Sequence, residues 1–256
     1  MPNLNSKILV LANWKVNLSL AETLALVKKL LTGVAKLKGN FELGLCPTFP
    51  ALPGVAKLLQ KKKVLLGAQN VFWKPNGPYT GEISPSVLRE LGVKYVIVGH
   101  SERRQYLKET DIMIRQKIAA TLAEGLTPVL CVGETFAERQ AGQKDIVVAR
   151  QISAALTGIT LSPGHELVIA YEPVWVIGSG RAVAPEEAFY IARVIRQSLI
   201  DIFSTRMVDS QIKIIYGGSV NTSNIASFVG RGKLGGVLVG GASLEAKSFL
   251  ALLKQL

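Results

Sequence analysis

One carboxylate stands where an apolar, strand-like run ends. Glu172 directly follows the run 167–171 and directly precedes Pro173. A charged group rarely ends a buried strand, and a proline restricts the backbone of the residue before it, so Glu172 is both positioned and held. A carboxylate mounted in this way suits a general base in a proton transfer. The segment from Pro173 to about Arg181 carries glycines at its far end, and we expect it to act as a lid.

Polar side chains that could stabilise negative charge follow two other apolar runs. Asn13 and Lys15 come directly after the first run, and His100 follows the fourth, with Ser101 and Glu102 next to it. An ammonium group can stabilise an oxyanion, and an imidazole can donate or accept a proton. Together with Glu172, these residues predict a site for proton-transfer chemistry.

Two glycine pairs point to a phosphate group. Gly217 and Gly218 precede Ser219 after the seventh apolar run, and Gly240 and Gly241 follow the eighth. Glycine lets the backbone approach an anion closely, and the start of a helix offers free amide groups. Barrels of alternating strands and helices often bind phosphate after their last two strands.

These residues must be positioned by an alternation of strands and helices. Short β-branched apolar runs are each followed by a loop and a stretch with helical spacing, which predicts parallel strands joined by helices. The eight predicted strands are Ile8–Ala12, Phe41–Leu45, Val64–Ala68, Tyr95–Val98, Pro128–Cys131, Leu167–Tyr171, Ile212–Tyr216 and Gly236–Val239. Eight units in a chain of this length favour one α/β domain over residues 1–256, a single (β/α)8 TIM barrel, although an open doubly wound sheet stays possible.

Several helix ends can be predicted from local signals. Ser19, Ser84-Pro85 and Pro185 are expected to open helices over 20–31, 87–91 and 186–203. Gly33, Gly92 and Gly125 fall where helices are expected to stop.

Composition bounds the class of protein. The 256 residues are 48% apolar and 19% charged, an ordinary globular composition, and no run suggests a signal peptide or a membrane span, so we expect a cytoplasmic protein. Cys46 and Cys131 end apolar runs and are predicted to be buried free thiols. The two cysteines and two histidines show no ligand spacing, so no metal site is expected.

The net charge of +12 would attract phosphorylated metabolites, nucleic acid or anionic surfaces without choosing among them. Lysines gather at 36–38 and 61–63 with no interleaved aromatic residues of the kind that stack on bases. We therefore favour a solvated basic surface and expect no specific nucleic-acid partner.

Five motifs in order resemble the triosephosphate isomerase family, and the resemblance covers nearly the whole chain. They are Asn-Trp-Lys at 13–15, Gly-His-Ser-Glu-Arg-Arg at 99–104, Tyr-Glu-Pro-Val-Trp at 171–175, Tyr-Gly-Gly-Ser-Val at 216–220 and Leu-Val-Gly-Gly-Ala-Ser-Leu at 238–244. The resemblance implies an isomerase of glycolysis and gluconeogenesis. It would interconvert dihydroxyacetone phosphate and D-glyceraldehyde 3-phosphate through an enediolate, with no cofactor.

The resemblance assigns roles to the polar strand ends. Glu172 would be the base, His100 the electrophile and Lys15 the fixed positive charge, with Asn13 contacting substrate beside it. A helix starting at Ser101 would disfavour a charged His100 ring. The other histidine, His165, precedes the sixth strand and so lies on the wrong side of the barrel.

Further residues follow from the resemblance. The Gly178 amide would close on the substrate phosphate together with Ser219, Gly240 and Gly241. Ser101 and Glu102 would support the site. Glu102 would pair with Lys15 and Arg103 with Glu109, although ordinary surface salt bridges are the alternative. Val176 and Ser179 stand where the family commonly has alanine and threonine, and the larger valine could alter lid closure.

A long segment, 69–82, separates the third strand from its helix and needs an explanation. In the family this loop inserts into a neighbouring subunit, so the resemblance implies a homodimer through loop 70–82. Thr80 would reach the partner subunit's Asn13 and the partner subunit's Glu102. Phe72, Trp73 and Pro78 differ from the commonest forms, and a monomeric variant is the alternative.

Two other functions remain open from the sequence. One is a different phosphate-binding barrel enzyme that shares only the glycine sites after the last two strands. The other is a catalytically weak barrel that serves as a binding scaffold, with its positive charge engaging nucleic acid. The trio Lys15, His100 and Glu172 in these contexts argues against the first alternative. The second would require binding that discriminates between nucleic-acid sequences or shapes, because charge alone gives only nonspecific binding.

Overall fold

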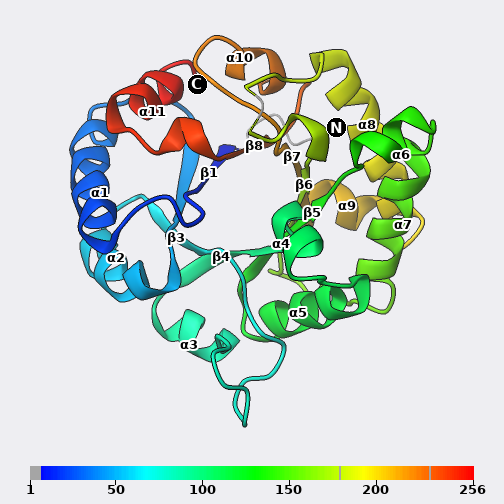
Figure 1. Cartoon of the computed structure of the whole chain (residues 1–256), viewed down its shortest axis with the longest axis horizontal. Helices are drawn as coiled ribbons and strands as arrows, with labels where there is room; N and C mark the ends of the chain where they lie inside the picture. Colours follow the sequence, from blue (N-terminus) through cyan, green and yellow to red (C-terminus); the bar gives the residue numbers. More distant parts are fainter. Residues whose placement is uncertain (1–6, 179, 231) are drawn as a thin grey trace.

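Eight parallel strands form a closed barrel in sequence order, in a computed structural model that describes residues 7–178, 180–230 and 232–256 (Figure 1). The strands are β1 (Ile8–Asn13), β2 (Phe41–Cys46), β3 (Leu65–Ala68), β4 (Val93–Val98), β5 (Thr127–Val132), β6 (Leu167–Tyr171), β7 (Ile212–Tyr216) and β8 (Gly236–Val239). Pairing of β1 with β8 closes the ring. The predicted barrel is confirmed, and each predicted strand is present to within two residues at its ends.

Helices surround the barrel. They are α1 (Leu20–Val34), α2 (Leu52–Leu59), α3 (Pro85–Glu90), α4 (Ser101–Tyr106), α5 (Asp111–Ala123), α6 (Phe136–Gln140), α7 (Lys144–Leu156), α8 (Pro185–Ile200), α9 (Thr205–Gln211), α10 (Ile225–Phe228) and α11 (Ala246–Leu253), with one-turn 3₁₀ helices η1 (Phe49–Ala51), η2 (Val174–Val176) and η3 (Gly241–Ser243). Ser19 caps α1 in a reciprocal pair with Glu22, and Pro185 opens α8, as predicted.

Two predicted helix ends differ from the structure: α8 ends at Ile200 rather than at residue 203, and α1 ends at Val34 rather than before Gly33. Gly33 lies inside α1, which continues to Val34, whereas Gly92 and Gly125 follow α3 and α5 with φ values of 75° and 70°. A Cβ atom at Gly33 would lie 2.2 Å from Cδ1 of Leu250 in α11. Gly33 is therefore explained by the close packing of two helices and not by a left-handed helix end.

The strands alternate between two cores. Inward side chains such as Leu9, Tyr95 and Ile97 fill the barrel, and outward ones such as Val10 and Val96 pack beneath the helices.

Two of the inward side chains are cysteines. Cys46 and Cys131 are buried free thiols, as predicted, and burial raises the pKa of Cys46 to about 12. Within the described ranges, no helix is long and apolar enough to cross a bilayer.

The topology brings all strand carboxyl ends to one end of the barrel. The loops that follow the strands therefore face one another across its axis, and the polar segments singled out in the sequence lie on these loops. The loop between β3 and α3 projects well away from the barrel (Figure 1).

Candidate active site

A cavity of about 360 Å³ opens at the carboxyl ends of the strands. Its lining includes every residue that the sequence analysis expected to contact substrate: Asn13, Lys15, His100, Glu172, Gly178, Ser219, Gly240 and Gly241. Loops after β1, β4, β6, β7 and β8 contribute to it, so residues more than 200 positions apart meet in one cavity.

A second cavity, of about 640 Å³, is larger but lies at the other end of the barrel. It is bordered by α8 and α9 and by the amino ends of β6 and β7, with Phe189 and Ile212 in its lining. His100, Glu172 and the two glycine pairs all line the smaller cavity. Because a site is identified by its chemistry rather than by its volume, we assign the candidate active site to the smaller cavity.

Glu172 is held deep in this cavity. Its side chain is 1% exposed, its amide donates to the Val132 carbonyl at 2.7 Å, and its Oε2 accepts from the Ser101 amide at 3.1 Å. Oε1 lies 3.2 Å from Nε2 of His100 but accepts no hydrogen bond from any described residue. A buried carboxylate oxygen without a partner is costly, and such groups occur where a ligand or a proton is to be taken up.

His100 is presented by the start of α4. It is the N-cap residue, and its Nδ1 accepts from the Glu102 amide at 3.2 Å. A nitrogen that accepts a hydrogen bond carries no proton, so this contact assigns a neutral ring with its proton on Nε2. Nε2 is the atom that faces Glu172. His165 lies before β6, outside the cavity, where its Nδ1 accepts from the Ser162 amide.

Lys15 adopts a strained backbone conformation. Its φ is +52°, a region that residues other than glycine seldom occupy. Gln69 holds it there, since its Nε2 donates to the carbonyls of Lys15 at 2.8 Å and Cys46 at 3.0 Å. Nζ of Lys15 donates to Oε1 of Glu102 at 2.5 Å, so the expected pair forms. Sequence reasoning had missed the part played by Gln69.

The glycine pairs lie beside these charged groups: a Cβ on Gly240 would lie 3.8 Å from Cε of Lys15, and one on Gly217 would lie 2.8 Å from Cγ of Glu172. Gly240 directly precedes η3, which Gly241 opens, and both residues border the cavity with Ser219. Gly178 is exposed in the lid with φ +73°, and apart from its chain neighbours no described residue has an atom within 4 Å of a Cβ built on it. Backbone amides at such turns suit an anion such as phosphate.

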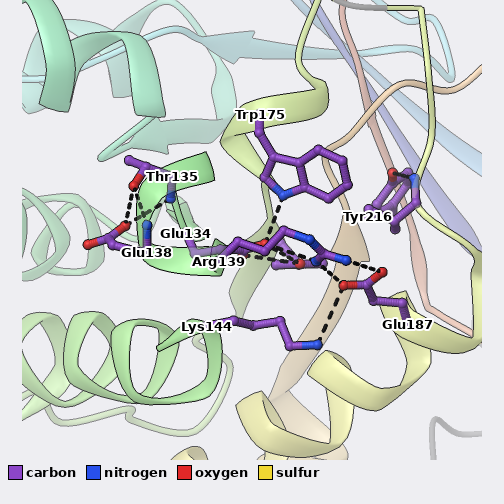
Figure 2. A network of polar contacts seen from close by, with 10 residues as sticks. Glu134, Thr135, Glu138, Arg139, Lys144, Trp175, Glu187 and Tyr216 are labelled. Carbon is purple, nitrogen blue, oxygen red and sulfur yellow. Dashed lines mark hydrogen bonds and ion pairs between the residues drawn. The ribbon is translucent and has the colours of Figure 1, made fainter. Parts of the chain in front are cut away.

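A network of polar contacts around the buried Glu134 holds the first part of the lid (Figure 2). Trp175 in η2 donates from Nε1 to Oε1 of Glu134 at 2.9 Å, and the Arg139 guanidinium stacks over its ring at 4.4 Å. Arg139 also binds Glu187 with two nitrogens, which lowers the pKa of Glu187. Glu134 is fully buried, and burial raises its pKa. None of these partners was identified from the sequence.

Val176 in the lid and Val183 just after the lid are held near the glycine turn that follows β7. Val176 is buried and its carbonyl accepts from Oγ of Ser219 at 2.8 Å. The amide of Val183 donates to the Tyr216 hydroxyl at 3.3 Å, and burial raises the pKa of Tyr216 to about 12. The larger side chain expected to matter at Val176 thus packs into the core. Ser179, the other departure from the family pattern, lies outside the described residues.

Gly133 does not line the cavity but packs against the backbone of Glu172, a role that the sequence did not predict. It follows β5, and a Cβ on it would lie 1.7 Å from the carbonyl oxygen of Glu172. Gln151 binds both its amide, at 2.8 Å, and its carbonyl, at 3.2 Å. The absence of a side chain at Gly133 therefore lets the backbone that carries Glu172 pass close to β5.

We expect Gly133→Ala to lower the free energy of unfolding by about 2 to 3 kcal/mol, because the new methyl group meets fixed backbone rather than a side chain. Urea denaturation monitored by circular dichroism would measure the loss. Gly54→Ala in α2 is the matched control. Its Cβ would meet only the flexible end of Leu24, at 3.0 Å, so we expect a change below about 1 kcal/mol. Equal changes in both variants would contradict this explanation.

A largely buried polar cluster joins α4 to α5 and to the segment that follows β3. Arg103 binds Glu109 at 2.6 Å, which is the expected pair, and Glu109 also binds the buried Lys117. Lys117 donates to Oδ1 of Asn70 at 2.7 Å, and burial lowers the pKa of Lys117. The cluster links the segment after His100 to the start of the projecting loop.

Thr80 lies outside the cavity, in the projecting loop, where residues 74–82 are all exposed. The loop is ordered by its own contacts: the Phe72 amide donates to the Ile83 carbonyl at 2.8 Å, and the rings of Phe72 and Tyr79 lie 4.8 Å apart. Val16, which follows Lys15, is 88% exposed. Within one chain, Thr80 therefore does not contribute to the cavity.

Comparison with known proteins agrees with this geometry. A family model described as triosephosphate isomerase matches residues 8–256. The triosephosphate isomerase of Carboxydothermus hydrogenoformans is 42% identical over 248 residues, which are 97% of this chain and 98% of that protein. The triosephosphate isomerase of Dictyoglomus thermophilum is 42% identical over 96% of this chain and 98% of its own. That of a Roseiflexus species is 45% identical over 95% of each chain.

Proposed function

The chain belongs to the triosephosphate isomerase family, and from that membership we propose that its cavity interconverts dihydroxyacetone phosphate and D-glyceraldehyde 3-phosphate. The observation that carries the proposal is the Oε1 atom of Glu172, buried and without a hydrogen bond from the described residues, beside Nε2 of His100. The reaction moves one proton between adjacent carbons and reverses the oxidation states of those carbons. It therefore needs a base, a proton donor at oxygen and a site for phosphate, and the cavity offers all three.

In the proposed reaction, Glu172 removes a proton from one carbon of the triose and returns it to the neighbouring carbon. The C–H bonding pair becomes the enediolate double bond, and the carbonyl π pair moves to oxygen. The Glu172 side chain is 1% exposed, so almost no water competes with the substrate at its oxygens. The hydrogen bond from the Ser101 amide fixes one oxygen and leaves the other free to accept the proton.

His100 and Lys15 stabilise the negative charge that this transfer creates. The proton on Nε2 of His100 would be donated to the substrate oxygen, and the neutral ring could then take a proton from the second oxygen. The Lys15 ammonium, held by Glu102, supplies a positive charge that needs no rearrangement during the reaction. Asn13 lies in the cavity beside Lys15 and would contact the substrate. Ser101 and Glu102 act by orienting these groups.

The phosphate of the substrate would bind at the glycine turns. Gly178, Ser219, Gly240 and Gly241 all line the cavity, and their backbone amides would donate to the phosphate. Lid closure over the phosphate would exclude water from the enediolate, which otherwise loses its phosphate.

The lid anchors should matter for turnover. We expect Tyr216→Phe to lower kcat/KM by about three- to tenfold, because it removes one hydrogen-bond acceptor from the Val183 amide. Steady-state rates with glyceraldehyde 3-phosphate would measure the change. Tyr190→Phe is the matched control, since Tyr190 bonds Asp145 on the exposed side of α8 and should leave the rate unchanged. Equal values of kcat/KM in the two variants would show that the hydrogen bond between Val183 and Tyr216 does not affect turnover.

We also propose that the chain works as a homodimer through loop 70–82. The exposed, ordered loop and the exposed Val16 beside Lys15 support this, because a partner's loop carrying Thr80 could cover both Val16 and the edge of the site. Sedimentation at twice the 27.6 kDa chain mass would agree with a dimer, and a monomer at assay concentration would overturn it. The two buried free thiols suit the reducing cytoplasm, where we place the enzyme.

The proposed activity is tested by following glyceraldehyde 3-phosphate conversion in buffer containing a metal chelator. Robust turnover would establish the reaction and would agree with a mechanism of proton transfer alone, without a cofactor. A folded protein that shows no turnover would overturn the proposal and would favour a barrel that only binds its ligand.

A further inference from the structure

One side of the barrel carries most of the net positive charge. The helices α11, α1 and α2 lie next to one another, on the left of Figure 1. On these helices and the loops that follow α1 and α2 stand ten exposed lysines, which we call the basic face: Lys28, Lys29, Lys36, Lys38, Lys57, Lys61, Lys62, Lys63, Lys247 and Lys254. The exposed carboxylates on the same helices and their caps are Glu22 and Glu245. Ten lysines against two glutamates leave +8 of the +12 of the whole chain.

These lysines differ from many other basic residues in their ion pairing. In the described part of the chain, none of the ten ammonium groups lies within 4 Å of a carboxylate. Lysines and arginines elsewhere do form ion pairs, including Arg104 with Asp111 at 2.6 Å and Arg196 with Asp209 at 2.7 Å. Glu22 is already engaged with Ser19 in the cap of α1. The charge of the basic face is therefore available to an outside anion.

The residue types on the basic face restrict what that anion can be. Every positively charged residue of the basic face is a lysine. A lysine ammonium binds phosphate as a point charge and lacks the bidentate geometry by which arginine recognises bases. Among the described residues of these three helices, Leu20 is the one large apolar side chain that is well exposed, and it is not aromatic. Binding of single strands relies on aromatic stacking, and insertion into a bilayer relies on exposed apolar groups. The basic face is poorly suited to either.

The placement of the lysines also matters. Lys36 and Lys38 lie in the loop that leads into β2, and Lys62 and Lys63 lie in the loop that leads into the neighbouring β3. They form a band at the amino ends of the strands, opposite the active-site cavity. A duplex carries its charge along a line, about one charge per 1.7 Å of axis, and matches such a band better than a planar membrane does.

We propose that the basic face binds double-stranded nucleic acid through its phosphate backbone, without preference for base sequence. The contact is electrostatic, so it weakens with salt and leaves the cavity at the other end of the barrel open. Duplex binding by the basic face does not depend on the isomerase reaction. The presence or absence of isomerase activity therefore does not test this proposal.

The test uses the intact protein and a short labelled DNA duplex. The affinity of the unaltered protein should fall steeply between about 50 and 200 mM salt, with log K falling by about 0.9 per phosphate neutralised for each unit of log salt. The face variant carries Lys36→Gln, Lys38→Gln, Lys62→Gln and Lys63→Gln. We expect its affinity to fall by at least about tenfold at low salt and its salt slope to flatten by about one for each lysine that no longer neutralises a phosphate.

A matched variant separates the face from net charge. Lys108→Gln, Arg115→Gln, Arg193→Gln and Arg206→Gln also remove four exposed positive charges, and these residues lie on α5, α8 and α9 or directly after α4, away from the basic face. This variant should bind the duplex almost as the unaltered protein does, and both variants should keep the isomerase rate, which reports their folding. Equal losses of affinity in the two variants would overturn the proposal, as would tighter binding to a single strand of the same length or to phosphatidylserine vesicles.

Discussion

Glu172→Gln is expected to lower kcat by about 10⁴-fold, because the amide cannot accept the proton that the carboxylate takes from carbon. Glutamine has the same shape and can still accept a hydrogen bond from the Ser101 amide, so the cavity should keep its form. KM should therefore change little, which assigns the loss to the chemical step rather than to binding. Initial rates in both directions of the isomerisation, with a coupled assay, would measure it.

Two further variants define the cause of that loss. Glu172→Asp keeps the charge but withdraws the carboxylate by about one bond length, and a displacement of about 1 Å can cost about 10²-fold in rate. Glu166→Gln removes a carboxylate at the other end of β6, where Glu166 pairs with Lys94 at 2.9 Å, and should leave kcat unchanged. Near-normal turnover by Glu172→Gln, or an equal loss in Glu166→Gln, would contradict the assignment of the base.

The barrel could be predicted because its strands are buried on both faces. A run such as Val129–Cys131 has apolar side chains on both sides, one set for the barrel interior and one for the helices. Each run is followed by a helical pattern, so the connections must cross over and the strands must be parallel. Once the strands are parallel, their polar ends share one end of the barrel. The meeting of Lys15, His100 and Glu172 in one cavity then follows from topology.

Contacts between distant backbones could not be predicted. Gly33 and Gly125 look alike in the sequence, yet Gly33 allows α1 to approach Leu250 while Gly125 has a positive φ after α5. Gly133 showed no signal of its own, because its neighbour, the Glu172 carbonyl, is 39 residues away along the chain. A glycine that serves a turn has local signs, but a glycine that serves packing is explained only by its partner.

The lid anchors escaped prediction for the same reason. Trp175 lies in η2 and Glu134 lies just after β5, and their hydrogen bond spans 41 positions of the chain. Val183 uses a backbone amide, which carries no residue-specific signal, to bind Tyr216. By contrast, the pair of Lys15 with Glu102 could be expected, since both belong to motifs that resemble the family and both follow strands at the same end of the barrel.

His100→Gln is expected to lower kcat by about 10² to 10³-fold, the usual loss when one preorganised donor to a developing oxyanion is removed. The Glu102 amide occupies Nδ1, so the single ring proton is fixed on Nε2, where it faces the reacting atoms. Glutamine can offer an N–H group at a similar place, but its amide cannot pass a proton from one substrate oxygen to the other. The loss should therefore appear in kcat while KM changes little.

The second histidine provides the control for this assignment. His165→Gln alters a ring at the amino end of β6, whose Nδ1 accepts from the Ser162 amide, and should leave turnover intact. The hydrogen bond to Nδ1 of His100 comes from the Glu102 backbone amide, so a Glu102→Gln variant should keep it. The same variant should weaken the contact that Lys15 makes with the Glu102 side chain. Its rate should then fall less than that of His100→Gln. A His100→Gln enzyme with normal kcat would show that Lys15 alone stabilises the enediolate, and it would remove the histidine from the mechanism.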